Sequence, residues 1–227
     1  MGVLLIADSG STKAEWCLLD GNKKKRVITT GLSPYFVSGQ QMQQVFKEVL
    51  YPKISQQLPD EIFFYGTGCS NPQNLKTIKA ALKSVFTKSA ISVDHDLIGA
   101  SRALCGHKKG IACILGTGSN SCFYNGKKIV KNSPGLGYVL GDEGSGAYLG
   151  KKVVQYFLYN TFDPDLMDRF NAKYHLSASE ILDSVYKQPL PNRYLARFCM
   201  FLSENRGHYM IENIIEDGFN DFFFHHI

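Results

Sequence analysis

The chain has 227 residues, of which 44% are hydrophobic and 12% aromatic, enough to build the core of one large domain or two smaller ones. Its net charge of +5 is small and its lysines are scattered, which argues against a nucleic-acid partner. The first apolar run stops at Asp8, too early for a signal peptide or a membrane span, so a cytoplasmic protein without membrane partners is expected.

The cysteines point to the same compartment. There are six, without a C-x-x-C pair or a histidine at zinc-ligand spacing. Cys17, Cys113 and Cys122 lie inside apolar runs. We interpret all six as free thiols of a protein in a reducing environment.

The first half of the chain predicts alternating strands and helices. Three strands are expected over 3–7, 14–19 and 25–30, joined by the polar turn "DSGSTK" and by the hairpin signal Asp20-Gly21. Apolar residues at helical spacing follow over 38–54. A strand at 61–66, a helix opened by Pro72 and a strand at 90–94 complete this part.

The order of parts begins again near residue 110. "IACIL", the turn "GTGSN", "SCFY", an Asn-Gly turn and "KKIVK" match the opening strands and turns, which indicates an internal duplication. From residue 142 onward the spacing is mostly helical. We therefore expect two α/β domains, 1–106 and 107–227, each with a mixed sheet, and a ligand cleft between them.

The first predicted turn, "ADSGSTK", carries groups that hold phosphate. Gly10 permits close approach of a ligand, Ser11 and Thr12 offer hydroxyl and amide groups, and Lys13 adds positive charge. Asp8, at the end of the strand, is suited to hold Mg²⁺ through water. The alternative is an ordinary polar turn in which Asp8 only shapes the local backbone.

The second turn, "LGTGSNS", is its counterpart. Gly116 and Gly118 flank Thr117, and this loop can hold a phosphate while Ser119 and Asn120 face a substrate hydroxyl. Neither a P-loop nor a dinucleotide-binding glycine motif is present. Two such turns at matching points of a repeat suggest that both grip one polyphosphate.

A candidate catalytic carboxylate lies between the two turns. In "ISVDHDLIGASRAL" a strand ends at Asp94 and Asp96 and a helix begins. Phosphoryl transfer to an alcohol uses a carboxylate to accept the hydroxyl proton, and Asp96 is placed for that. The alternative is that Asp96 only caps the helix.

These motifs carry a family resemblance. "ADSGSTK", "DLIGAS", "LGTGSN" and the glycine-rich segment "GLGYVLGDEGSGAYLG" (135–150), in this order, resemble the BadF/BadG/BcrA/BcrD ATPase family and, within it, the N-acetylglucosamine kinases. The likeness spans about the first 160 residues, and "GDEGSGAYLG" is its most specific part. It implies the actin, hexokinase and Hsp70 superfamily, with two ribonuclease H-like domains that close on ATP.

The resemblance implies a role for each motif. Asp96 falls on the carboxylate that activates the sugar 6-hydroxyl, and Asn120 and Asp142 fall on sugar-contacting residues. The phosphate motifs match at Asp8, Gly10, Thr12, Thr117 and Gly118. For Asp142 the alternative is an N-cap at a glycine-rich helix entry. Gly66 and Thr67, in "YGTGCSN", are expected to form a second sugar-side loop, unless their segment is only a strand-to-helix turn.

Two departures from the family affect these expectations. Pro34 and Tyr35 stand where the kinases commonly have a sugar-contacting asparagine, which leaves the sugar open. Family members continue with a strand and a turn that contacts adenosine, whereas this sequence stops at "NDFFFHHI". We therefore expect the second domain to be incomplete and the adenine contacts to lie beyond residue 227.

The sequence thus predicts an ATP- and Mg²⁺-dependent kinase of an amino sugar, most specifically N-acetylglucosamine. Two alternatives stay open: an ATPase that activates a partner enzyme, and a sugar or nucleotide sensor without turnover. The partners expected are ATP and a small sugar, and a homodimer is left open.

Overall fold

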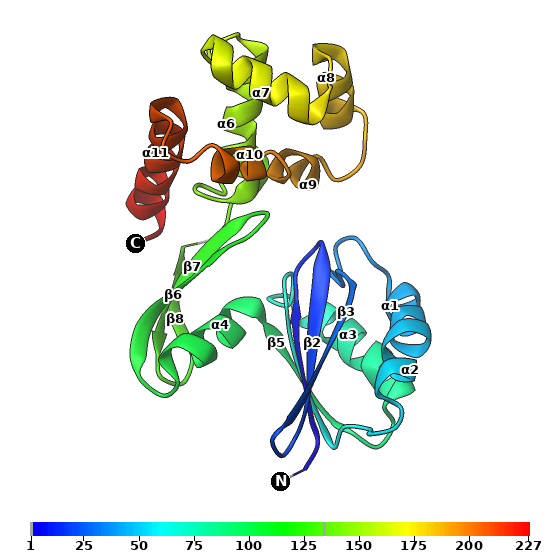
Figure 1. The fold of residues 1–227 in the computed structure, drawn as a ribbon. Helices are drawn as coiled ribbons and strands as arrows, with labels where there is room; N and C mark the ends of the chain where they lie inside the picture. The colour runs from blue at the N-terminus through cyan, green and yellow to red at the C-terminus, as the bar shows by residue number, and fades with distance from the viewer. Residues whose placement is uncertain (1, 134) are drawn as a thin grey trace. The chain divides into compact units, whose positions relative to one another are not determined.

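The computed structural model describes residues 2–133 and 135–227. The chain has a mixed α/β fold and divides into two compact units (Figure 1). Unit 1 contains the residues up to Lys108 together with Gly126–Lys128, and unit 2 contains Lys109–Asn125 and Ile129–Ile227.

Unit 1 is built on a five-stranded sheet with the order β3-β2-β1-β4-β5. β1, β2 and β3 form an antiparallel meander, whereas β4 pairs parallel to β1 and β5 parallel to β4. Gly21, at the tip between β2 and β3, has φ +54°, a conformation that favours glycine. The strands are β1 (Leu4–Ser9), β2 (Lys13–Asp20), β3 (Lys23–Thr30), β4 (Glu61–Gly66) and β5 (Ala90–His95).

Helices cover both faces of this sheet. Phe64 of β4 packs in the core with residues of α1 and α3, while the next residue, Tyr65, meets Gly99 of α4. Because successive strand residues point to opposite faces, α4 lies on the face opposite α1 and α3, as Figure 1 also shows. The helices are α1 (Gly39–Val45), α2 (Tyr51–Ile54), α3 (Pro72–Val85) and α4 (Asp96–Cys105).

The core of unit 1 centres on a buried tryptophan. Trp16 is fully buried, and its ring meets Phe46 edge-on with the ring centroids 5.6 Å apart. Its indole Nε1 donates a hydrogen bond to Thr29 Oγ1 at 3.1 Å. The only polar atom of this side chain is therefore satisfied inside the core.

The helix expected over 38–54 is interrupted. Between α1 and α2 the segment Phe46–Leu50 is π-helical, and the Tyr51 amide donates to the carbonyl of Phe46, five residues back. Pro52 lacks an amide hydrogen and its ring would crowd the carbonyl four residues earlier. A π-helical turn just before the proline widens the helix and accommodates that conflict.

Unit 2 begins with an antiparallel sheet, β6-β7-β8, that repeats the meander of β1-β2-β3. It consists of β6 (Lys109–Leu115), β7 (Ser119–Asn125) and β8 (Ile129–Ser133). The mixed sheet expected here is not found within residues 2–133 and 135–227, because the elements described after β8 are helices.

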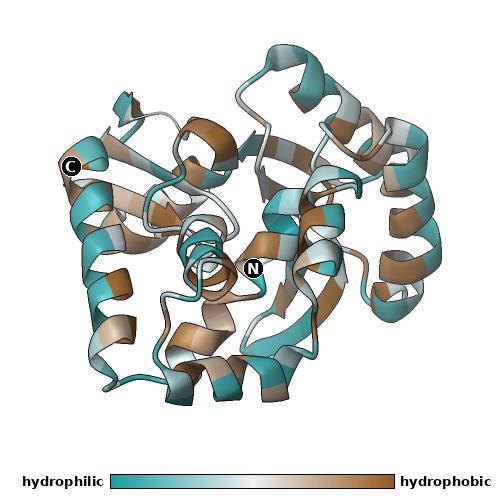
Figure 2. Ribbon diagram, turned by 90° about the horizontal axis from the view of Figure 1, so that it is seen from above, coloured by the Kyte–Doolittle hydropathy of each residue, from teal (hydrophilic) through white to brown (hydrophobic). Residues whose placement is uncertain are grey.

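The helices of unit 2 form their own aromatic core, in which Phe157 and Phe198 stack on the fully buried Phe170. In Figure 2 the helices mix hydrophobic and hydrophilic residues along their length, as amphipathic helices do. Of the helices that the structure describes, none combines the length and apolar character needed to cross a bilayer. The helices are α5 (Gly137–Leu140), α6 (Gly146–Leu158), α7 (Pro164–Tyr174), α8 (Ala178–Tyr186), α9 (Pro191–Ala196), α10 (Cys199–Glu204) and α11 (Tyr209–His226).

Glycines let α6 approach α9 closely. A Cβ on Gly150 would lie 2.0 Å from the carbonyl oxygen of Leu195, and one on Gly146 would lie 3.3 Å from Ala196 Cβ. The first distance is far below van der Waals contact, and the obstacle is backbone. Gly150, at the end of the glycine-rich segment, is therefore required by helix packing.

We predict that Gly150→Ala destabilises the protein. Alanine in a helix interior gains about 1 kcal/mol in propensity, but the clash with the Leu195 carbonyl should cost about 1 to 3 kcal/mol beyond that gain. Thermal or urea unfolding measures the sum. Gly39→Ala, where the nearest atom is a side-chain methyl of Thr77 at 3.1 Å, is the control and should change stability little. A stabilised Gly150→Ala protein would contradict the close packing of α6 on α9.

Candidate functional site

In unit 1 the predicted site residues gather at one edge of the sheet. β1, β4 and β5 are parallel, and their register pairs Ser9 with Gly66 and Gly66 with His95, so these strands end side by side. β3 ends at the same edge, since Thr30 pairs with Lys13 at the start of β2. The edge therefore collects the first turn, the loop after β4 and the start of α4.

The first turn is closed by a hydrogen bond from the Gly10 amide to the Lys13 carbonyl at 3.0 Å. The Gly31 amide donates to the Thr12 carbonyl at 3.1 Å, and a Cβ on Gly31 would lie 2.4 Å from the Ser11 carbonyl oxygen. Gly31 was not among the predicted site residues. The sequence feature that could have identified it is a glycine directly after the third predicted strand. In the structure Gly31 packs against the backbone of the first turn.

Asp8 occupies a negatively charged position at this edge. Partial burial raises the pKa of its carboxyl group, as do, to a smaller extent, the nearby carboxylates of Asp96 and Glu15, and Lys13 only partly opposes them. Ionised Asp8 and Asp96 thus repel each other. A bound cation would relieve this repulsion.

These residues fit a magnesium ion. No group of three or more His, Cys, Asp or Glu side chains able to hold a metal is present among the residues described. Mg²⁺ commonly keeps several waters and takes one or two carboxylates together with substrate phosphates. Asp8 is suited to be such a ligand, directly or through water.

The loop after β4 is tied to the first turn. The Thr67 amide donates to the carbonyl of Ser9 at 2.9 Å, and Thr67 itself is half-buried. A Cβ on Gly66 would lie 2.6 Å from the Phe64 ring, so this glycine is required by packing. Packing at a strand-to-helix turn therefore explains the glycine at position 66 without a sugar contact. Burial, with a smaller effect from nearby Asp96, raises the pKa of Cys69 to about 12, which keeps the thiol protonated.

Tyr35 lies over the same loop. Gly68 has φ +77°, and a Cβ there would lie 2.8 Å from the Tyr35 ring. The Tyr35 side chain is 65% exposed. The residue that departs from the family pattern is thus next to the predicted sugar-side loop and open to solvent.

Asp96 is the first residue of α4, and the N-cap is His95. The Asp96 Oδ1 atom accepts a hydrogen bond from the Leu97 amide at 2.9 Å and lies 2.8 Å from His95 Nδ1. Its side chain is mostly buried but 18% exposed, so part of it is open to solvent. Asp96 contributes to the start of the helix while it remains accessible to a ligand.

The second turn is held by the N-terminus of α6. The Gly116 amide donates to the Gly118 carbonyl at 2.9 Å, and the amides of Gly146 and Ala147 donate to the carbonyls of Gly116 and Thr117 at 2.8 and 3.1 Å. The glycine-rich segment and "GTGSN" therefore pack against each other directly, although the bonded residues are 30 positions apart in the sequence.

Ser119 and Asn120 begin β7. The Ser119 hydroxyl is buried and has no hydrogen-bond partner among the described residues. Asn120 Oδ1 accepts from Asn132 Nδ2 at 2.8 Å, a neighbour that the sequence did not reveal because it lies on β8. This contact orients the Asn120 amide at the base of the turn.

Asp142 lies against the second turn. Asp142 is 8% exposed and has a φ angle of +59°. A Cβ on Gly118 would lie 2.7 Å from Asp142 Oδ2. Burial raises the pKa of the carboxyl group, and hydrogen bonds from the backbone of Ser119 and Gly137 oppose that effect. The N-cap of α6 is Ser145, which accepts from the Tyr148 amide at 3.2 Å, so Asp142 is not the helix cap.

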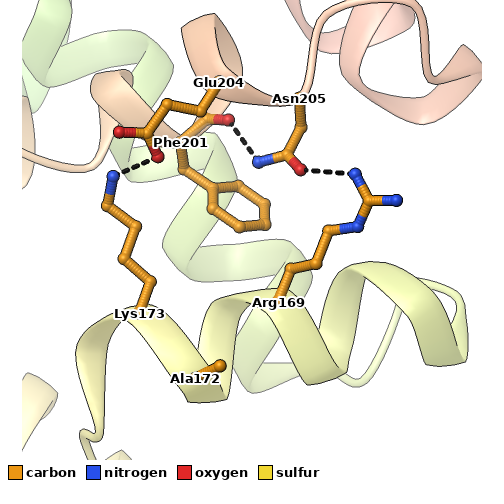
Figure 3. Close-up of a pocket in the computed structure, with 6 residues that line it drawn as sticks. All are labelled: Arg169, Ala172, Lys173, Phe201, Glu204 and Asn205. Carbon is orange, nitrogen blue, oxygen red and sulfur yellow. Dashed lines mark hydrogen bonds and ion pairs between the residues drawn. The ribbon is translucent and has the colours of Figure 1, made fainter.

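Elsewhere in unit 2 an open pocket of about 410 Å³ lies between α7 and α10 (Figure 3). Arg169 donates to Asn205 Oδ1 at 3.0 Å and pairs with Asp165, and Lys173 pairs with Glu204. Both basic side chains of the pocket therefore have acidic partners. The predicted site residues are absent from its lining, which is Arg169, Ala172, Lys173, Phe201, Glu204 and Asn205.

We predict that Asp142→Asn stabilises the protein at neutral pH. The folded state raises the pKa of this carboxyl group above its ordinary 3.8, so stability falls as the pH rises from 3.8 through the folded pKa and stays lowered above it. Asparagine removes the buried charge and tolerates a positive φ. The gain in free energy of unfolding should be present at pH 7 and shrink as the pH approaches 3.8.

Urea unfolding at both pH values measures this difference, and Asp168→Asn, at an exposed position on α7, controls for the loss of one charge. A destabilised Asp142→Asn protein at pH 7 would show that the hydrogen bonds from Ser119 and Gly137 outweigh the burial of the charge.

Among known proteins, no family model and no curated protein matches the sequence. Solved structures do match. The putative N-acetylglucosamine kinase from Porphyromonas gingivalis is 38% identical, with a TM-score of 0.95 over 99% of this chain and 80% of that one.

Two more distant structures share the fold. The putative N-acetylglucosamine kinase from Chromobacterium violaceum has a TM-score of 0.70 at 19% identity, over 97% of this chain and 82% of its own. MreB5 of Spiroplasma citri, solved bound to ADP, has a TM-score of 0.53 at 9% identity, over 82% and 62%. Given the identity and coverage of the Porphyromonas gingivalis protein, this chain belongs to the family of N-acetylglucosamine kinase-like proteins.

Proposed function

We propose that this protein is an ATP-dependent sugar kinase that phosphorylates the 6-hydroxyl group of an amino sugar, N-acetylglucosamine in the first instance. The observation that carries the proposal is the accessible Asp96 carboxylate at a sheet edge shared with Asp8 and the first turn. Membership of a family whose similar structures are named N-acetylglucosamine kinases supports the choice of substrate class.

In this proposal the two turns bind ATP phosphates. In the first turn the groups are those of Gly10, Ser11, Thr12 and Lys13, and in the second those of Thr117 and Gly118. The close approach of Gly31 to the first turn and of Asp142 to the second supports rigid turns, which can hold phosphate oxygens without reorganisation. Adenine-contacting residues are not assigned.

Asp96 acts as the general base. As the sugar 6-oxygen forms its bond to the γ-phosphorus, its proton passes to the Asp96 carboxylate, and the bond between that phosphorus and the leaving oxygen of ADP breaks. Mg²⁺, held near Asp8, neutralises charge on the phosphates when bound. Leu97, through its amide, keeps one oxygen of Asp96 in place during the transfer.

Sugar recognition is assigned to polar groups near each turn. In unit 2 these are Ser119, whose buried hydroxyl has no partner in the described structure, Asn120 and Asp142. In unit 1 the group is Thr67, next to Gly66, whose own role is packing. A carboxylate kept in a buried, unfavourable position such as that of Asp142 is typical of a functional group and not of a stabilising one.

A substrate panel tests the function. N-acetylglucosamine, N-acetylmannosamine, glucosamine and glucose are each supplied with ATP and Mg²⁺, and ADP release and the sugar phosphate are measured. We expect turnover with N-acetylated sugars and the phosphate on the 6-oxygen. ADP release that no sugar accelerates would contradict the proposal and favour an ATPase that acts on another partner.

We predict that Asp96→Asn lowers kcat by about 10²- to 10⁴-fold, the usual contribution of a general base, while the dissociation constant for ATP stays within about twofold. Asparagine keeps the shape of the side chain but cannot accept the hydroxyl proton. Asp94→Asn, two residues away, serves as the control for charge and should have a much smaller effect. Equal turnover in wild type and Asp96→Asn would remove Asp96 as the base.

A further inference from the structure

Three atoms at the start of α4 lie within hydrogen-bond distance of one another. His95 Nδ1 is 2.8 Å from Asp96 Oδ1, the Leu97 amide nitrogen is 2.9 Å from the same oxygen, and it is 3.1 Å from His95 Nδ1. The Leu97 amide supplies one hydrogen. Whether the His95 ring supplies a second one decides what this arrangement does.

If His95 Nδ1 carries no hydrogen, it caps the helix by accepting from Leu97. Its lone pair then faces the Asp96 Oδ1 lone pairs at 2.8 Å, and the two acceptors repel each other. If Nδ1 carries the hydrogen, it donates to Oδ1, and the Leu97 amide donates to the same oxygen. The second assignment removes this repulsion and still gives the Leu97 amide an acceptor, so the hydrogen-bond geometry favours the Nδ1–H form.

We propose that His95 is a positioning residue, which donates from Nδ1 to Asp96 Oδ1 and thereby presents the Oδ2 atom to the substrate hydroxyl group. This inference rests on the proposed role of Asp96 as general base. Oδ2 accepts no hydrogen bond from the described part of the chain, so it is the oxygen available to take a proton.

The surroundings of His95 agree with this assignment. The hydrogen bond to Asp96 raises the pKa of the imidazole, burial opposes it, and the charges of Asp96 and Asp94 add to the increase. Asp94 in turn lies 3.6 Å from Arg102 of the same helix. The side chains of His95 and Asp96 are 21% and 18% exposed, so their contact is largely shielded from water while part of the Asp96 side chain stays accessible.

Three substitutions distinguish a donor that positions Asp96 from an acceptor that caps the helix. His95→Ala can act as neither. His95→Asp restores a good N-cap but carries no donor and repels Asp96, whereas His95→Asn restores the N-cap and offers Nδ2 in place of Nδ1. We expect kcat to fall about 10- to 100-fold in the Ala and Asp variants and to recover most of its value in the Asn variant, with the KM for ATP unchanged throughout.

Melting temperatures identify any variant that fails to fold, and the comparison of His95→Asn with His95→Asp, both capped, remains valid if His95→Ala does not fold. His175→Asn, at an exposed left-handed position where asparagine is tolerated, controls for loss of an imidazole and should leave kcat unchanged. Wild-type kcat in His95→Asp, or equally low kcat in the Asn and Asp variants, would overturn the proposal.

A second measurement does not depend on turnover. The nitrogen chemical shifts of the His95 ring report which nitrogen is protonated, and at pH 8 we expect Nδ1 to carry the hydrogen. A ring protonated on Nε2 alone would overturn the proposal even in a fully active enzyme. If no sugar is phosphorylated while Nδ1 is protonated, the proposed function fails and the His95 to Asp96 hydrogen bond stands.

Discussion

The parallel pairing of β1, β4 and β5 is the constraint on which the candidate site of unit 1 depends. Strands that run in the same direction end at the same edge, so Asp8 and Asp96, 88 positions apart in the sequence, come close enough for the Asp96 carboxylate to raise the pKa of Asp8. Placing like charges together costs folding free energy. Such a repulsion at one edge of a sheet is typical of a binding site, because a positively charged ligand would relieve it.

Unit 2 also contains a carboxylate whose position lowers folding stability, in this case through burial. Asp142 is buried, has a positive φ and lies against Gly118. Glu143, the next residue, lies 3.3 Å from the imidazole of His226 at the end of α11. Neighbouring acidic residues therefore have different surroundings, one beside the turn and the other beside a helix end.

Local patterns predicted the first sheet well. The hairpin at Gly21, the helix opened by Pro72 and the succession of strands and helices along the chain up to His95 follow from turn residues and apolar spacing, and the mixed α/β class follows from them. The family resemblance is confirmed by the Porphyromonas gingivalis structure. The roles of the individual site residues stay predictions.

What the sequence could not reveal depends on contacts between distant segments. The packing of Gly150 on Leu195 requires knowing that α6 meets α9, and the bond between Asn120 and Asn132 requires the register of β7 with β8. His95 was overlooked because a histidine between two aspartates has no pattern of its own. Its meaning appears only when the distance from Nδ1 to Oδ1 is known.

The close approach of α6 to α9 has a consequence for how variation in this family should be interpreted. Gly146 binds the Gly116 carbonyl through its amide and lies 3.3 Å from the side chain of Ala196. Gly146 therefore lies between the second turn and α9, a helix outside both glycine-rich motifs. A natural variant with a bulkier residue at position 196 would shift the backbone of the turn, and its effect would resemble that of a substitution in the turn itself although the changed residue lies outside it.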